Sequence, residues 1–70
     1  MRTCEIRVGR SYLPASGRGV RRDVAEIGFV NGRWRVVYLN DGKRESWCDL
    51  TTFARWAGAE IYPRQPDSRQ

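Results

Sequence analysis

Residues 24–39 read VAEIGFVNGRWRVVYL, and this stretch decides the fold. Asn31-Gly32 lies at its centre and is flanked on both sides by residues that favour strands. The dipeptide is typical of a two-residue type I′ turn, because both central positions of that turn need a positive φ. The stretch therefore predicts a β-hairpin with strands at Val24–Val30 and Arg33–Leu39.

A two-residue turn also fixes which side chains face each other across the hairpin. One face of the ladder then collects the cross-strand pairs Phe29/Trp34, Ile27/Val36 and Ala25/Tyr38. Every member of that face is apolar or aromatic, whereas the opposite face is mixed. The uniformly apolar face is therefore predicted to lie against the core.

Asp41-Gly42 predicts a second two-residue turn, which brings Lys43–Cys48 back as a third strand. In that register Val36 faces Trp47, so Trp47 joins the predicted core face. A three-residue loop would shift the register by one residue and expose Trp47. The two-residue turn is preferred because it keeps this large ring in the core.

The segments on either side of the meander supply the remaining elements. Cys4–Val8 alternates apolar and polar residues, which predicts a short half-buried strand. Arg10–Arg22 contains a proline and two glycines and predicts a long loop. After Asp49, a good N-cap residue, an apolar stripe with helical spacing predicts about two turns of helix. The stripe comprises Leu50, Phe53, Ala54 and Ala57, and Gly58 ends it. Ala59–Tyr62 predicts a last strand.

The order is thus strand, long loop, three-strand meander, short helix and last strand. Over about residues 3–62 this order resembles an SH3-like barrel of Tudor-like or KOW-like plan. It is also similar to very short barrel proteins of phages and mobile elements. The resemblance implies a mainly β, SH3-like five-stranded barrel with one short helix before the last strand. Residues 1–62 are expected to form a single domain and residues 63–70 a disordered tail.

The composition disfavours most catalytic and metal chemistry. The 70 residues include no histidine, so the usual general base and any Ser-His or Cys-His pair are missing. Two cysteines without histidine leave the usual zinc shell half empty. The chain is therefore expected to be no enzyme and to hold no cofactor or metal. No apolar run approaches the roughly 20 residues of a membrane span. A cytoplasmic protein with reduced cysteines and no membrane partner is predicted.

The net charge of +5 falls in the first third of the sequence. Planar guanidinium groups suit phosphate contacts, and exposed aromatic rings stack on bases. The candidate nucleic-acid-binding residues are the arginines Arg10, Arg18, Arg21, Arg22, Arg33 and Arg35 with the aromatic residues Tyr12 and Trp56. Phe29, Trp34, Trp47 and Phe53 are expected in the core, and Tyr12, Trp56 and Tyr62 nearer the surface. A solvated charge set that keeps a small protein soluble would have the same composition.

Three functional hypotheses follow. The first is a non-enzymatic module that binds DNA or RNA through the basic loop Arg10–Arg22, with aromatic stacking. The alternative is a small protein-interaction module or inhibitor, phage or mobile-element encoded, that docks an aromatic patch with an arginine rim on an acidic protein surface. A third is a minimal enzyme assembled by oligomerisation. A further candidate binding feature is a Tudor-like cage of Tyr12, Trp34 and Tyr38 for a methylated ammonium. Short edge strands also make a homodimer an expectation.

Overall fold

A computed structural model describes residues 1–61, which form one antiparallel sheet and one short helix. The elements are η1 (Thr3–Glu5), β1 (Ser11–Pro14), β2 (Arg22–Val30), β3 (Arg33–Asn40), β4 (Arg44–Asp49), α1 (Leu50–Trp56) and β5 (Ala57–Ile61). The expected five strands, with a short helix before the last, are confirmed. The strand order is β4-β3-β2-β1-β5, and the sheet is open between β4 and β5, so a closed barrel is not confirmed. The predicted tail, residues 63–70, lies outside the described residues.

The β2–β3 hairpin forms around Asn31-Gly32 as predicted. Asn31 has φ 52° and Gly32 φ 78°, the left-handed conformations that a type I′ turn needs. Phe29 lies opposite Trp34 and the predicted register holds as far as Glu26/Val37. A β-bulge at Ala25 then sets Val24, rather than Ala25, opposite Tyr38. The bulge turns Val24 into the core, where only 3% of its surface is exposed.

The predicted register between β3 and β4 is wrong by one residue. Asn40 pairs with Arg44, so the loop has three residues, and Val37 rather than Val36 lies opposite Trp47. Asp41 and Gly42 still adopt positive φ, and Lys43 is the extra residue. The shift places the smaller Cys48 opposite Val36, on the face that α1 covers. Trp47 therefore points to the other face and is 57% exposed.

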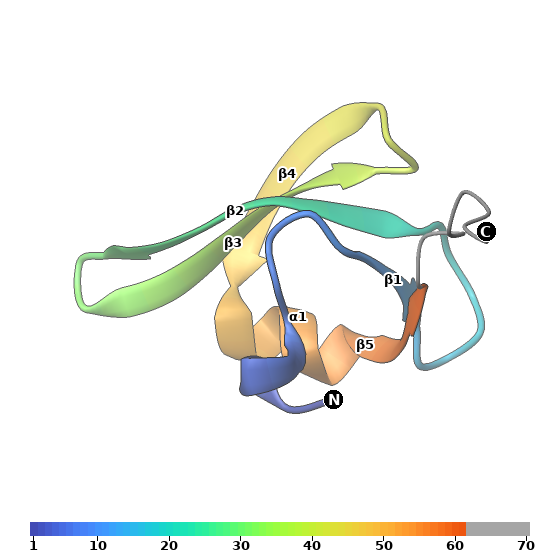
Figure 1. Ribbon diagram of the computed structural model, residues 1–70, viewed down its shortest axis with the longest axis horizontal. Coiled ribbons are helices and arrows are strands. Elements are labelled where there is room, and N and C mark those ends of the chain that lie inside the picture. The colour runs from blue at the N-terminus through green and yellow to red at the C-terminus, as the bar shows by residue number, and fades with distance from the viewer. Residues whose placement is uncertain (62–70) are drawn as a thin grey trace, which may run out of the picture.

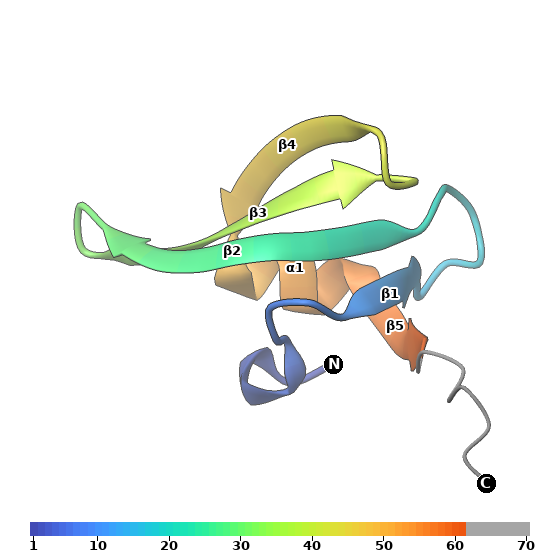
Figure 2. The ribbon, with the colours of Figure 1, turned by 45° about the horizontal axis from the view of Figure 1, so that its top comes forward.

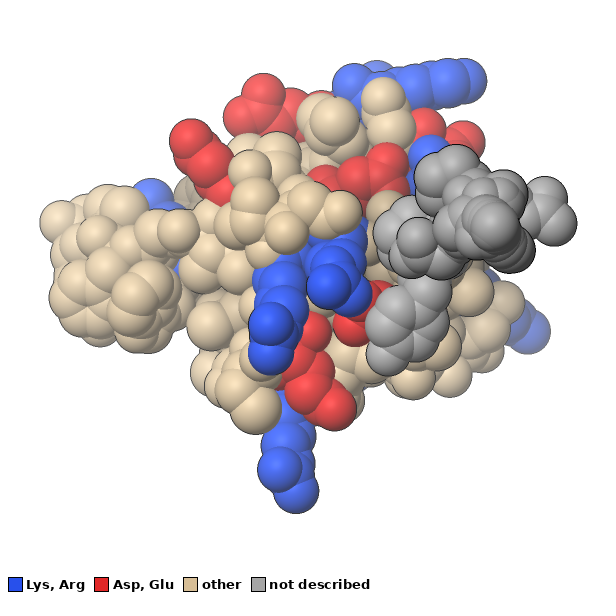
Figure 3. Space-filling model, viewed as in Figure 1, with Lys and Arg blue, Asp and Glu red and all other residues tan. Residues whose placement is uncertain are grey.

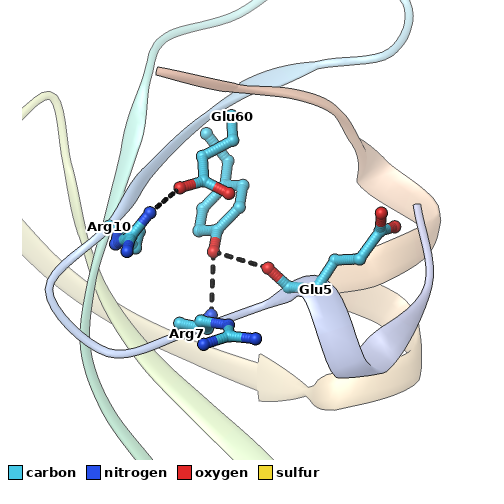
Figure 4. Close-up of polar contacts among 5 residues, drawn as sticks. Glu5, Arg7, Arg10 and Glu60 are labelled. Atoms are coloured by element: carbon cyan, nitrogen blue, oxygen red, sulfur yellow. Dashed lines mark hydrogen bonds and ion pairs between the residues drawn. The ribbon is translucent and has the colours of Figure 1, made fainter. Parts of the chain in front are cut away.

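The predicted strand Cys4–Val8 is also wrong. Residues 3–5 form a 3₁₀ turn, and the first strand is β1, inside the segment predicted to be a loop. Tyr12 of β1 explains the difference, since its fully buried ring anchors the strand to the core. Its hydroxyl donates to the Glu5 carbonyl at 2.9 Å and accepts from the Arg7 N–H at 2.8 Å. Figure 4 draws these two bonds as dashed lines that end at Glu5 and Arg7. These bonds fasten the N-terminal turn against β1.

Figures 1 and 2 show α1 lying against one face of the sheet, and the core side chains pack between the two. Among residues 1–61 the core contains eight buried side chains: Ile6, Tyr12, Val24, Val36, Tyr38, Phe53, Ala54 and Ala57. Phe53 of α1 is at its centre, with ring centroids 5.6 Å from Tyr12 and 5.4 Å from Tyr38. The expectation that Phe53 is a core residue is confirmed, and the expectation that Tyr12 lies near the surface is wrong.

The helix covers only part of the sheet. Seven helical residues span about 10 Å, whereas the nine residues of β2 span about 30 Å. The turn end of the β2–β3 hairpin therefore extends beyond α1, as both ribbon views show. At that end the apolar face of the hairpin has no helix against it.

Candidate binding surfaces

Three of the six predicted phosphate-binding arginines have carboxylate partners. Arg10 is paired with Glu60 of β5 (Figure 4). The Nε atom of Arg21 lies 2.9 Å from Oδ1 of Asp23. Nη1 of Arg33 lies 3.2 Å from Oδ2 of Asp49, in an exposed pair. The charge of these three guanidinium groups is therefore largely balanced within the chain.

Two more of the arginines stack on aromatic rings. The guanidinium carbon of Arg22 lies 4.1 Å from the Trp56 ring centroid and 4.5 Å from that of Tyr38. That of Arg35 lies 4.4 Å from the Trp47 ring centroid. Arg18 is exposed, and among residues 1–61 no carboxylate lies within ion-pairing distance of it.

The six arginines do not form one surface. Arg22 and Arg33 pair with Asn40 and Val30 respectively, at opposite ends of the β2–β3 ladder. Figure 3 shows basic side chains scattered among acidic ones across the middle of the viewed face. The structure therefore does not gather the predicted residues into a single phosphate-binding patch.

The two predicted stacking residues belong mainly to the core. Tyr12 has no exposed surface, and burial raises the pKa of its hydroxyl. Trp56 is half-buried, with its ring 5.3 Å from Phe53 and its face against Arg22. Neither ring is free on both faces to stack on a base. The predicted cage of Tyr12, Trp34 and Tyr38 does not form either, because Trp34 lies beyond the core while both tyrosines are buried.

The most exposed apolar surface is one that the sequence analysis assigned to the core. We call residues 29–34 the hairpin tip. In it, 59% of Phe29 and 53% of Trp34 are exposed on one face of the ribbon, and 43% of Val30 is exposed on the opposite face. Phe29 and Trp34 form an edge-to-face pair with ring centroids 5.1 Å apart. The predictions that Phe29, Trp34 and Trp47 are core residues are wrong.

The hairpin tip is a two-stranded ribbon. β1 pairs with β2 only at Arg22 and Asp23, and the pairing of β4 with β3 ends at Arg35. Figures 1 and 2 show this end projecting from the rest of the sheet, and Figure 3 shows mostly neutral side chains there. The length of the hairpin relative to the short helix is the sequence signal that could have predicted this exposure.

A groove of about 350 Å³ adjoins the hairpin tip where the chain turns from β4 into α1. It is lined by Thr3, Arg33, Trp34, Asp49, Leu50 and Thr51. Trp34 and Leu50 supply an apolar wall, and the Arg33–Asp49 ion pair supplies a polar edge. The groove can therefore accept an apolar side chain beside a hydrogen-bonding group.

A second, smaller hollow of about 210 Å³ lies on the sheet face opposite α1. Its lining residues are Glu26, Gly28, Val30, Arg35, Val37 and Trp47. Trp47 from β4 borders it, with the Arg35 guanidinium stacked on the indole. The Nε atom of Arg35 is buried and has no hydrogen-bond partner among the described residues.

The described residues hold little else with chemical function. Among them, no three histidine, cysteine, aspartate or glutamate side chains gather where a metal ion could bind. No helix within residues 1–61 is long and apolar enough to cross a membrane. Both cysteines are free thiols, and burial raises the pKa of the Cys48 thiol. No protein-family model, curated protein or solved structure matches the chain.

Proposed function

We propose that this chain is a non-enzymatic binding module that docks on a protein partner through the hairpin tip. One observation carries the proposal: Phe29 and Trp34 expose 59% and 53% of their surface side by side at the end of a projecting ribbon. Apolar side chains scattered singly over a surface need no explanation, but a contiguous aromatic group commonly marks an interaction site.

The surroundings of the tip fit a protein interface. Tryptophan and arginine are enriched among the residues that dominate binding energy, and such residues work best when the partner excludes water around them. Trp34 and Arg33 are adjacent on β3, and the groove beside them provides a concave surface. The excess of positive charge favours a partner whose surface is acidic.

Binding of nucleic acid through Arg10–Arg22 stays a prediction. Three arginines of this loop already have partners within the chain, which favours a structural role over phosphate binding. Arg10 and Arg21 are paired with carboxylates, and Arg22 stacks on an aromatic ring. Fluorescence anisotropy with short DNA and RNA at about 50 and 200 mM salt separates the two functions, since phosphate-dominated binding weakens steeply over that range. We expect no salt-sensitive binding at micromolar protein.

We also propose that the fold is an open member of the SH3-like class and that the protein is cytoplasmic. The order of the elements and the pairing of β1 with both β2 and β5 support the fold assignment. Two unpaired cysteines suit a reducing compartment.

Affinity capture with matched variants tests the docking proposal. Phe29→Ser with Trp34→Ser removes the exposed aromatic pair. Val8→Ser with Val20→Ser is the control, because these residues are 56% and 50% exposed but lie outside the hairpin. A protein retained by the wild type and the control, and lost from the tip variant, supports the proposal. Equal capture by the two double variants contradicts it.

A further inference from the structure

We propose that the hollow beside Trp47 recognises a carboxylate of the partner, with an apolar side chain of the partner seated next to it. This inference rests on the proposed function and specifies the partner as an acidic-apolar segment of protein. It assigns a role to the sheet face opposite α1, which the hairpin-tip proposal does not use.

The hollow is built by strand alternation on three adjacent strands. Gly28 lies opposite Arg35, and Val37 lies opposite Trp47. A Cβ atom placed on Gly28 would meet no atom within 4 Å, so the missing side chain leaves an open floor. Around this floor, Val30 and Val37 supply aliphatic surface and Trp47 a ring that is 57% exposed. This arrangement fits one apolar side chain.

Arg35 supplies the charged part of the site. Among residues 1–61 it has no carboxylate within ion-pairing distance, unlike Arg33 two residues before it. Its Nε–H is shielded from solvent and has no acceptor. Buried donors are nearly always satisfied in native proteins, so an unsatisfied one indicates where an acceptor is missing. A carboxylate is the acceptor that matches the planar guanidinium fork.

Trp47 controls access to this donor. Its ring covers the guanidinium at 4.4 Å and is more than half exposed, so it has few neighbours to hold it in place. An acceptor reaches Nε when the indole moves aside, and the displaced ring can then pack on the partner's apolar side chain. Binding should therefore change the fluorescence of Trp47.

Glu26 makes a carboxylate a better occupant than a nucleic-acid strand. Its side chain lines the same hollow and is not paired with Arg35. One carboxylate of a partner can lie on the Arg35 side, away from Glu26. A strand carrying a phosphate on every nucleotide would bring further negative charge towards it.

Synthetic nonapeptides test the inference. Each contains one Asp or Glu and one Phe or Leu at varied spacing, and its counterpart replaces the acid by Asn or Gln. Anisotropy titration should show wild-type protein preferring the best acidic peptide over its amide counterpart by about tenfold, the size of one charge-assisted hydrogen bond. Arg35→Gln should abolish this preference and Glu26→Gln should strengthen binding. Arg44→Gln, with the same charge change at an exposed site outside the hollow, should preserve the preference.

The remaining outcomes are separable. A preference for the acidic peptide that survives Arg35→Gln overturns the inference, as does the absence of any peptide binding at millimolar concentration. Binding of a 15-nucleotide oligothymidine that Arg35→Gln removes, without a peptide preference, also overturns it. If capture of a protein is lost from the Phe29→Ser/Trp34→Ser variant but kept by Arg35→Gln, the hairpin-tip proposal stands and the inference fails. Melting temperatures of all variants verify that they fold.

Discussion

Arg22 should contribute to stability through its aromatic contacts rather than through an ion pair. Its guanidinium carbon lies 4.1 Å from the Trp56 ring centroid, 4.5 Å from that of Tyr38 and 5.9 Å from that of Phe53. The contacts join β2 and β3 to α1 across the edge of the core. Arg22→Met keeps the length and the apolar stem of the side chain but removes the charge.

The expected loss follows from the two close contacts. Each cation–π contact contributes about 0.5–1 kcal/mol at an exposed site and about 2 kcal/mol when desolvated. For half-buried Arg22 we expect Arg22→Met to cost about 1–2 kcal/mol in the free energy of unfolding. In a domain of this size that loss lowers the melting temperature by roughly 4–15 °C.

Urea unfolding followed by tryptophan fluorescence provides the assay, and a double-mutant cycle with Trp56→Leu isolates the pairwise contact. We expect a coupling energy of about 1 kcal/mol, well above the roughly 0.3–0.5 kcal/mol within which independent substitutions add. Arg22→Lys, which keeps a cation, should lose less than Arg22→Met. A coupling energy near zero, or equal losses for Met and Lys, would refute the reasoning.

Further predictions concern packing, the turn and pH. A Cβ atom on Gly58 would lie 2.5 Å from Cα of Ala15, so Gly58→Ala should lower the free energy of unfolding by about 1–3 kcal/mol by disturbing the β1–β5 pairing. Gly28→Ala is the control in thermal unfolding. It should cost less than about 1 kcal/mol, because no atom lies within 4 Å of the added Cβ. Gly32→Val should lower stability by about 1 kcal/mol or more, because φ there is 78°; an unchanged melting temperature would contradict the type I′ turn. Burial raises the pKa of Tyr12 above its unfolded value, so the folded state favours the protonated hydroxyl. That stabilisation is complete below the unfolded pKa of about 10 and is lost as the pH rises through the folded pKa. The free energy of unfolding measured with urea should therefore fall from pH 9 to pH 11. An unfolding free energy that stays constant over this range would contradict the prediction.

The sequence predicted correctly the elements whose formation depends on neighbouring residues alone, which are the first turn and the helix. Asn31-Gly32 specifies its turn through two positive φ values, and the hairpin forms around it in the expected register as far as Glu26/Val37. The stripe that contains Phe53 predicted α1 for the same reason, since periodicity and the capping position lie within one segment. Asp41-Gly42 also turns the chain, but the dipeptide is compatible with a loop of two or three residues. The three-residue loop is the one that places Cys48, rather than Trp47, on the face that packs against the core.

The candidate site depended on packing that local patterns do not encode. Trp34 and Phe29 share the face of Val36, so alternation placed all of them in the core. The helix is too short to reach the hairpin tip, and the core closes instead around Tyr12, a residue in a segment that resembled a loop. Exposure of Trp34 and burial of Tyr12 thus have one cause, which is how far α1 extends along the sheet.

Site-specific photo-cross-linking tests the central claim, that the hairpin tip docks on a protein. p-Benzoylphenylalanine replaces Trp34 in one sample and Val20, an equally exposed position outside the hairpin, in the other. After irradiation in the source cells we expect one discrete protein adduct from position 34 and none from position 20. No adduct from position 34, or the same adducts from both positions, would contradict the account.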